Sequence, residues 1–278
     1  METCAAITKK GTRCTRKAVN NDRCKMHDKG PAPVYQFGGK CITLTFANSI
    51  ENGPGMEIIN GANNYHPFTI AQLQTLYDNY IGEKELIHLT LDEPHEPAAV
   101  LVLRNFCTNA DLLFQDLTVL SWDSKAKFKG VVKNKNARHN LCFANFAQEA
   151  DYEAGKGTVV QIDTIPNLLN LQTQIEQLTG FAGMNAEGNY YYDISRCYIS
   201  GHGDFERNIV IGVRFGDSIP LHFHWYHRFK PIGEKFTIHL NHSDLYIMSE
   251  KAVGQDWKKS SQITLRHSAG LTKQAEFK

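Results

Sequence analysis

Alternating hydrophobic and polar positions run through most of the chain after residue 34 and predict a protein built mainly from β-strands. The alternation is clear over residues 40–46, where Ile42, Leu44 and Phe46 share one face. Further runs of strand length occupy residues 85–91, 98–103, 189–194, 209–215, 221–227, 236–240, 244–249 and 263–267. The later runs follow one another at the spacing of an antiparallel barrel or jelly roll.

Two segments show the period of a helix instead. Residues 69–80 carry an apolar stripe behind Thr69, a candidate N-cap, and residues 167–178 end just before Gly180. Little room is left after Gly180 for another long helix. We therefore expect a mainly β (α+β) fold with flanking helices.

Length and charge restrict the protein class. The 278 residues fit one domain of about 200–250 residues with a small appendage. The net charge of +1 excludes a polybasic coat, so a nucleic-acid role would need local charge asymmetry. No apolar run reaches the ~18 residues of a membrane helix, and no signal-peptide core is present at the start. We expect an intracellular protein, cytoplasmic or nuclear, with association with a virion as an alternative.

Four metal-ligating residues near the start are regularly spaced. Cys4, Cys14, Cys24 and His27 form the pattern C-x9-C-x9-C-x2-H, which suits a closed tetrahedral Zn(II) site. Residues 1–30 hold few large apolar side chains, so metal binding would supply their folding free energy. The alternative is a disordered tail that happens to contain cysteines. A short Gly/Pro linker follows.

Basic residues gather in two places. Residues 1–30 carry eight lysines and arginines against three acids, and residues 125–138 carry six basic residues and no acid. Each group is either a solvated face or a contact for the phosphates of DNA or RNA. In the second group Lys133, Lys135 and Arg138 are candidate substrate-binding residues.

The sharpest chemical feature is the H-x-D pair of His202 and Asp204. On a strand, residues i and i+2 point to the same side, so both side chains could face one ion. With one distant histidine they would form the facial triad of non-haem Fe(II) oxygenases, which leaves positions for 2-oxoglutarate and oxygen. The alternative is a salt-bridged pair in a loop.

The order of motifs around this pair resembles the AlkB-like branch of the 2-oxoglutarate/Fe(II) dioxygenases. N-x-Y-x-D (189–193) precedes H-x-D-x-E (202–206), and then come a strand ending in Phe-Gly (209–216), HSDLYIM (242–248) and TLR (264–266). EGNYYYD, HGDFER, MSEKAVGQDWK and TLRHSAG are similar to AlkB-like proteins of large DNA viruses and some unicellular eukaryotes. The resemblance covers about residues 134–270.

The resemblance implies a double-stranded β-helix over residues 134–278, with iron at one open end and an α+β region, residues 31–133, packed on it. His202 and Asp204 would bind iron, and Asn189 and Tyr191 would contact 2-oxoglutarate. Arg266 matches an arginine that grips the far carboxylate of this cosubstrate. Glu206 and Arg207 lie where the family contacts substrate.

The chain departs from the AlkB pattern at the third metal ligand. Residues 256–259 read DWKK where that pattern has a histidine, which leaves His267 as the main candidate. His267 adjoins Arg266, and neighbours on a strand point to opposite faces. Either His267 binds iron and Arg214 or Lys273 holds the cosubstrate, or Arg266 points inward and the third ligand lies elsewhere. The other histidine candidates are His222, His224, His239 and His242.

Three functions follow from these patterns. The first is a dioxygenase that hydroxylates or demethylates a nucleic-acid base or a protein side chain. The second is a catalytically degenerate AlkB-like scaffold that acts as a binding or structural protein. The third is a sequence-reading DNA-binding protein, which no recognition-helix motif supports.

Overall fold

The computed structural model describes residues 14–16, 36–61 and 65–277. The chain divides into two compact units, Met1–Tyr35 and Gln36–Lys278. Three of the four predicted zinc ligands, Cys4, Cys24 and His27, lie outside the described residues, and the fourth, Cys14, is buried. The zinc module therefore stays a prediction.

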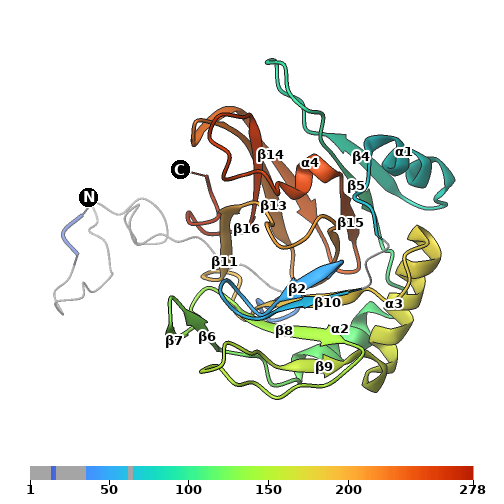
Figure 1. The fold of residues 1–278 in the computed structure, drawn as a ribbon, viewed down its shortest axis with the longest axis vertical. Helices are drawn as coiled ribbons and strands as arrows, with labels where there is room; N and C mark the ends of the chain where they lie inside the picture. Colours follow the sequence, from blue (N-terminus) through green and yellow to red (C-terminus); the bar gives the residue numbers. More distant parts are fainter. Residues whose placement is uncertain (1–13, 17–35, 62–64, 278) are drawn as a thin grey trace. The chain divides into compact units, whose positions relative to one another are not determined.

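The second unit is mainly β, as predicted, and holds two large sheets (Figure 1). The larger sheet has the order β4-β5-β15-β12-β1-β10-β8-β9, and the smaller has the order β11-β16-β13-β14. The larger sheet contains β1 (Cys41–Ala47), β4 (Lys84–His88), β5 (Ala99–Leu103), β8 (His139–Ala144), β9 (Val159–Gln161), β10 (Asn185–Tyr191), β12 (Ile211–Gly216) and β15 (Leu245–Met248). The smaller contains β11 (Tyr198–His202), β13 (Ile219–His227), β14 (Lys230–Leu240) and β16 (Thr264–Gly270). Neighbouring strands are antiparallel except β8 and β9.

Two hairpins and four α-helices complete the described part of this unit. The hairpins pair β2 (Ser49–Glu51) with β3 (Ile58–Asn60) and β6 (Lys125–Phe128) with β7 (Val131–Asn134). The helices are α1 (Ile70–Asn79), α2 (Ala110–Thr118), α3 (Pro166–Thr179) and α4 (Glu250–Val253), and a short 3-10 turn spans Ile162–Thr164. Among the described residues, no helix combines the length and hydropathy needed to cross a membrane.

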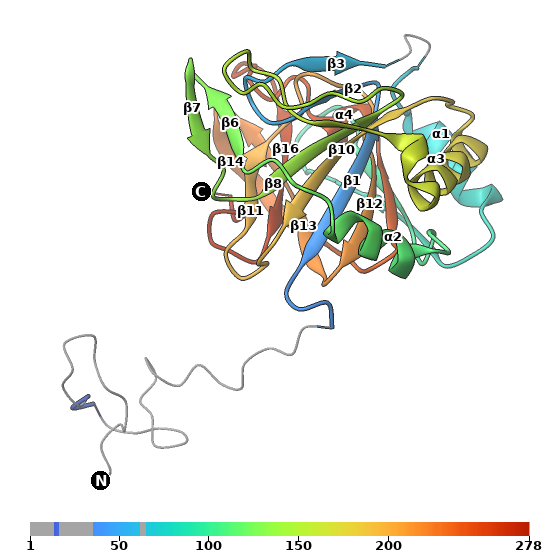
Figure 2. The same ribbon diagram turned by 90° about the horizontal axis from the view of Figure 1, so that it is seen from below.

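The larger sheet buries an apolar face against the helices. Ile42, Leu44 and Phe46 of β1 share one hydrophobic cluster with Leu113 of α2 and Leu168 of α3. Figure 2 shows α1, α2 and α3 gathered at one side of this unit. Because strand side chains alternate, the odd-numbered residues of β1 face the opposite side, toward the smaller sheet. This alternation leaves a polar face available for a site.

The two sheets pack together over only part of that inner face. A second cluster joins Val100 and Val102 of β5 to Phe223 and Trp225 of β13 and Leu265 of β16. Burying this apolar surface fixes the sheets against each other. Beyond the cluster, polar side chains replace apolar ones, and a cavity opens.

The hydrophobic pattern predicted most of these elements. Thr69 caps α1 in a capping box, and Gly180 ends α3 with a left-handed φ of 75°. The predicted division at residue 133 does not separate two bodies, because β1, β4 and β5 belong to the same sheet as β10 and β12. The elements that were not predicted are the helices α2 and α4, the β2–β3 and β6–β7 hairpins, and the strands β8, β9 and β11.

Candidate functional site

A cavity of about 570 Å³ opens between the two sheets. Its floor comes from β1, β10 and β12, and one wall comes from the β2–β3 hairpin. The opposite wall is formed by β11, the loop after it and β16. Phe205, Trp257 and Lys258 lie on its lining from two loops. Segments that are far apart in the sequence of the second unit thus line one cavity.

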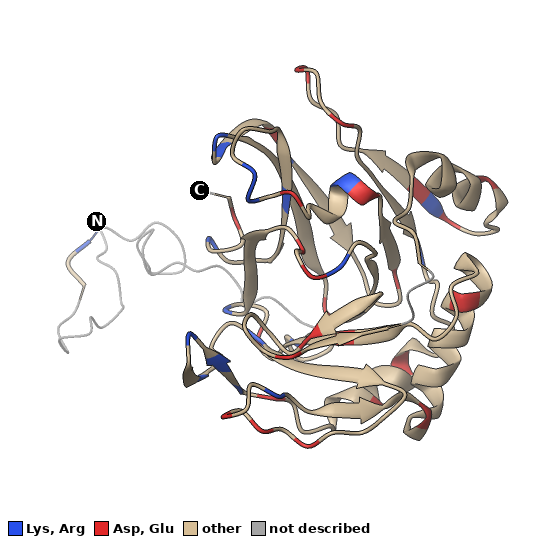
Figure 3. Ribbon diagram, in the orientation of Figure 1, with Lys and Arg blue, Asp and Glu red and all other residues tan. Residues whose placement is uncertain are grey.

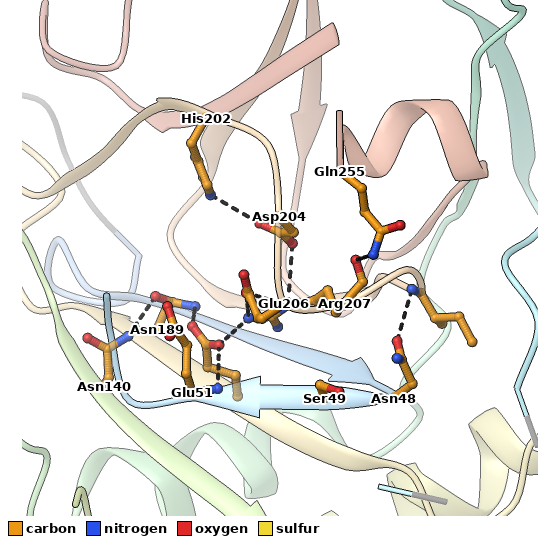
Figure 4. A network of polar contacts seen from close by, with 12 residues as sticks. Asn48, Ser49, Glu51, Asn140, Asn189, His202, Asp204, Glu206, Arg207 and Gln255 are labelled. Carbon is orange, nitrogen blue, oxygen red and sulfur yellow. Dashed lines mark hydrogen bonds and ion pairs between the residues drawn. The ribbon is translucent and has the colours of Figure 1, made fainter. Parts of the chain in front are cut away.

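His202, Asp204 and His267 converge in this cavity. β11 pairs with β16 so that His202 lies opposite His267, and Asp204 follows in the loop after β11. The Oδ1 atom of Asp204 lies 3.2 Å from His202 Nε2 and 3.4 Å from His267 Nε2. Figure 4 shows His202 pointing at Asp204. The three predicted metal ligands are therefore brought together.

The spacing of these donor atoms suits a divalent metal ion. One ligand atom from each residue lies within 4.8 Å of the other two. Two ligands about 2.1 Å from an ion and at right angles are roughly 3 Å apart, close to the two measured separations. The Nδ1 atom of His202 lies 2.8 Å from the carbonyl oxygen of Ser200, which leaves Nε2 directed at the ion position. Two imidazoles and one carboxylate on one side would leave the other side open.

The charges around the triad keep its carboxylate ionised. Burial opposes ionisation of Asp204, but the positive charge of Arg207 and contacts with His267 and His202 hold the pKa of this carboxyl well below its usual range. Burial lowers the pKa of His267, and the neighbouring His202 lowers it further. At His202 the effect of burial is outweighed by Asp204, so the pKa of this imidazole is raised. Asp204 thus offers the negative charge that a metal ligand needs.

A chain of polar contacts leads from Asp204 across the cavity floor (Figure 4). Arg207 contacts Asp204 at 3.5 Å and pairs with Glu187 at 2.5 Å. The other oxygen of Glu187 accepts a hydrogen bond from Asn189 Nδ2 at 3.2 Å. Asn189 Oδ1 in turn accepts from Asn140 at 2.8 Å. Arg207 lines the cavity, as a substrate-binding residue would, but its guanidinium is engaged by three carboxylates, including Glu206.

The floor of the cavity also presents an arginine with spare donor capacity. Arg214 of β12 is 1% exposed, and its Nε atom has no hydrogen-bond partner among the described residues. Thr43 of β1 lies opposite Arg214 on one side and Asn189 on the other. The hydroxyl of Thr43 also has no hydrogen-bond partner among the described residues. Tyr191 lines the cavity and is buried. These residues could bind a small carboxylate ligand.

The neighbours His267 and Arg266 of β16 have different surroundings. His267 lines the cavity, whereas Arg266 stacks on the rings of Tyr226 and Trp257, at 4.0 and 5.2 Å from their centroids, and is not part of the lining. The physical reason is strand alternation, which sends neighbours to opposite faces. Of the two arginines predicted to bind the cosubstrate, Arg214 lines the cavity and Arg266 does not.

The remaining alternative ligands lie outside the cavity lining. His222 contacts the hydroxyl of Thr237, and His224 contacts a backbone carbonyl. His242 stacks on Phe37, 4.6 Å between ring centroids. His239 and Lys273 do not contribute to the lining either.

The basic residues of the 125–138 run lie in different environments. Lys133 lies on the exposed β6–β7 hairpin, where Figure 3 shows basic residues gathered. Lys135 is not a cavity residue, because its ammonium group bonds the backbone and side chain of Asn52, and burial lowers its pKa to about 8. Arg138 does reach the cavity and bonds Asn189 Oδ1 at 2.5 Å. Of the five predicted substrate-binding residues, Arg138, Glu206 and Arg207 line the cavity, whereas Lys133 and Lys135 do not.

Two acidic residues of the cavity were missed from the sequence. Glu187 lies two positions before Asn189 on the same face of β10, and this spacing alone could have suggested its position. Glu51 ends β2, and no sequence signal links this hairpin to the site. Burial and the nearby charge of Glu187 raise the pKa of Glu51 to about 8.

Comparison with known proteins gives a family but no activity. No protein-family model matches the chain. A protein of Acanthamoeba polyphaga mimivirus, named "Uncharacterized protein R156", is 43% identical over 244 residues. The match spans 84% of this chain and 96% of the viral protein. The chain therefore belongs to the same protein family as this mimivirus protein.

Proposed function

We propose that the protein is an AlkB-like dioxygenase dependent on Fe(II) and 2-oxoglutarate, built on a double-stranded β-helix. One observation carries the proposal: two imidazoles and a carboxylate, from His202, His267 and Asp204, converge in a cavity between the two sheets. This donor set is typical of non-haem Fe(II) oxygenases. The motif order N-x-Y-x-D, H-x-D and T-L-R-H supports the same assignment.

The unpartnered donor of Arg214 supports 2-oxoglutarate as the second ligand. A buried arginine with a free N–H is costly unless a ligand completes its hydrogen bonds. In this proposal Arg214 would pair with the far carboxylate of 2-oxoglutarate. Thr43 and Tyr191 would contact the cosubstrate beside this arginine. Asn189, on the same strand as Tyr191, would orient the cosubstrate. When bound, the iron and 2-oxoglutarate would together use one molecule of oxygen to hydroxylate a substrate C–H bond: one oxygen atom would enter the substrate, and the other would enter the succinate that 2-oxoglutarate leaves on losing carbon dioxide.

The cavity mouth favours a nucleic-acid base over a protein side chain as substrate. Phe205 is 67% exposed and Trp257 lies near it, with the ammonium group of Lys258 over both rings. Aromatic faces stack on bases, and lysines contact phosphates. Arg138 and the lysines of the β6–β7 hairpin extend the basic surface. The N-terminal module would bind Zn(II) and add further positive charge. We propose an intracellular site of action, in the cytoplasm, the nucleus or a virion.

Anaerobic addition of Fe(II) and 2-oxoglutarate to the full chain tests this function. We expect a weak visible charge-transfer band and, on admission of air, formation of succinate. His202→Ala should abolish both, whereas His222→Ala, which changes a histidine outside the cavity, should leave both intact. Metal-replete protein without the band would contradict the proposal and favour a binding scaffold.

A further inference from the structure

The two oxygen atoms of Asp204 face different partners. Oδ1 lies 3.2 Å from His202 Nε2 and 3.4 Å from His267 Nε2, on the side where an ion would sit. Oδ2 forms an ion pair with Arg207, 3.5 Å from its Nε atom, while the Nε–H group itself donates to Glu206 Oε1 at 2.8 Å. A free carboxylate can rotate and bind a metal through either or both oxygens. Here the positive charge of Arg207 lies beside Oδ2, which favours Oδ1 as the oxygen that faces the ion.

Arg207 is itself held in place on several sides. Its Nη2 atom lies 2.5 Å from carboxylate oxygens of both Glu187 and Glu206. Its carbonyl oxygen accepts a hydrogen bond of 2.7 Å from Gln255, in the segment after α4. The side chain is 4% exposed. A buried guanidinium fixed by three carboxylates has little freedom to move.

The same contacts connect the metal ligand to the cavity floor. Glu187 uses its second oxygen to accept from Asn189, and Asn189 is fixed by Asn140 and Arg138. In Figure 4 the contacts can be followed from Asp204 through Arg207 to Asn189 and Asn140. Rotation of the Asp204 carboxylate would therefore move Oδ2 away from an arginine that is itself fixed to β10.

We propose that Arg207, held by Glu187, is a positioning residue that orients Asp204 for one-oxygen coordination of the metal. The proposal rests on the metal site of the proposed function. Partners of metal ligands of this kind typically contribute about 10–100-fold to metal affinity. Arg207 acts through Asp204 and does not itself contact the ion position.

Mn(II) titration followed by electron paramagnetic resonance tests this role without turnover. Mn(II) prefers oxygen and nitrogen ligands, so the cysteines of residues 1–30 should not compete. The full-length proteins to compare are wild type, Arg207→Lys, Arg207→Gln and Glu187→Gln. Arg104→Lys is the matched control, because Arg104 is ion-paired with Glu85 and Asp244 and does not line the cavity.

A positioning role and a purely electrostatic role of Arg207 predict different Mn(II) affinities for these variants. Arg207→Lys keeps the charge but loses the planar fork, so positioning predicts roughly 10-fold weaker Mn(II) binding, and a pure charge effect predicts none. Arg207→Gln removes a cation near the ion, so charge alone predicts tighter binding, whereas positioning predicts binding about 10–100-fold weaker. Glu187→Gln should fall between wild type and Arg207→Gln, and Arg104→Lys should match wild type.

Thermal unfolding of the metal-free proteins separates orientation from folding. Variants that remain folded and bind Mn(II) as tightly as wild type would overturn the positioning role alone. Wild-type protein that binds Mn(II) no better than His202→Ala would overturn the metal site of the proposed function as well. If Arg207→Gln does not fold, Arg207→Lys and Glu187→Gln carry the same comparison.

Discussion

At the scale of single residues, Gly203 shows how closely the metal-ligand loop is packed. A Cβ atom on Gly203 would lie 2.0 Å from the carbonyl oxygen of Gly254, which is backbone and cannot rotate away. The next residue is Asp204, whose N–H donates to the carbonyl of Val253 at 3.0 Å. Gly203 thus lets the loop approach α4 closely enough to aim the carboxylate.

We expect Gly203→Ala to displace Asp204 from the two imidazoles. The variant should lose about 1–3 kcal/mol of unfolding free energy because of overpacking, and Mn(II) affinity should fall with it. Urea unfolding and Mn(II) titration measure the two effects. Gly61→Ala is the control, because Gly61 lies outside the cavity lining and its Cβ would come no closer than 3.2 Å to the carbonyl oxygen of Asn48. Unchanged Mn(II) affinity in Gly203→Ala would contradict the close packing.

Glu51 should give the protein a distinctive pH dependence. Its pKa is raised to about 8 in the folded state by burial and by Glu187, while the unfolded chain has an ordinary value near 4.5. The folded state then binds a proton that the unfolded state has released. The contribution of Glu51 to the free energy of unfolding is therefore greatest below about pH 4.5. It decreases as the pH rises toward 8, by at most about 1.4 kcal/mol per pH unit.

Glu51→Gln removes this titration. Urea unfolding at pH 5, 6, 7 and 8 should show wild type losing stability relative to Glu51→Gln with each step. Parallel curves for the two proteins would mean that Glu51 ionises normally in the folded state.

At the scale of elements, the alternation of β16 assigns opposite roles to two adjacent residues. Arg266→Met should leave Mn(II) and 2-oxoglutarate binding unchanged and cost about 1 kcal/mol of stability, because it removes stacking on Tyr226 and Trp257. His267→Ala should abolish Mn(II) binding. Arg214→Met should weaken 2-oxoglutarate binding while Mn(II) still binds. Calorimetric titration separates these cases, and loss of 2-oxoglutarate binding in Arg266→Met would contradict the assignment.

The elements also show which parts of the fold a sequence can predict. Local signals, such as Thr69 before α1 and Gly180 after α3, act through the neighbouring backbone and were predicted correctly. The pairing of His202 with His267 depends on β11 lying beside β16, and no local pattern encodes which strands pair. For the same reason the sequence left the choice between Arg214 and Arg266 open. Glu51 was missed because its hairpin reaches the cavity only through tertiary packing.

At the scale of the whole molecule, the zinc prediction concerns one unit and the cavity concerns the other. The described contacts of the triad all lie within Gln36–Lys278. Full-length protein should therefore contain one zinc per chain, and Cys24→Ser should lose it without changing Mn(II) affinity. Elemental analysis and Mn(II) titration check the two statements. Zinc retained in full by Cys24→Ser would contradict the Cys3His assignment.

The uneven distribution of charge along the chain leads to a last prediction, on nucleic-acid binding. Residues 1–30 carry eight basic residues against three acids, although the whole chain has a net charge of +1. Each phosphate contact releases a counterion and steepens the salt dependence of binding. We expect both basic groups to contact the same single-stranded oligonucleotide. Two double variants test this, one with Arg13 and Arg16 changed to glutamine and one with Lys129 and Lys133 changed to glutamine. Each should reduce the slope of log K for oligonucleotide binding against log salt concentration. Fluorescence anisotropy over a salt series measures these slopes. A slope that changes for only one pair would restrict the contact surface to that unit, and unchanged slopes for both would exclude the two basic groups as the nucleic-acid surface.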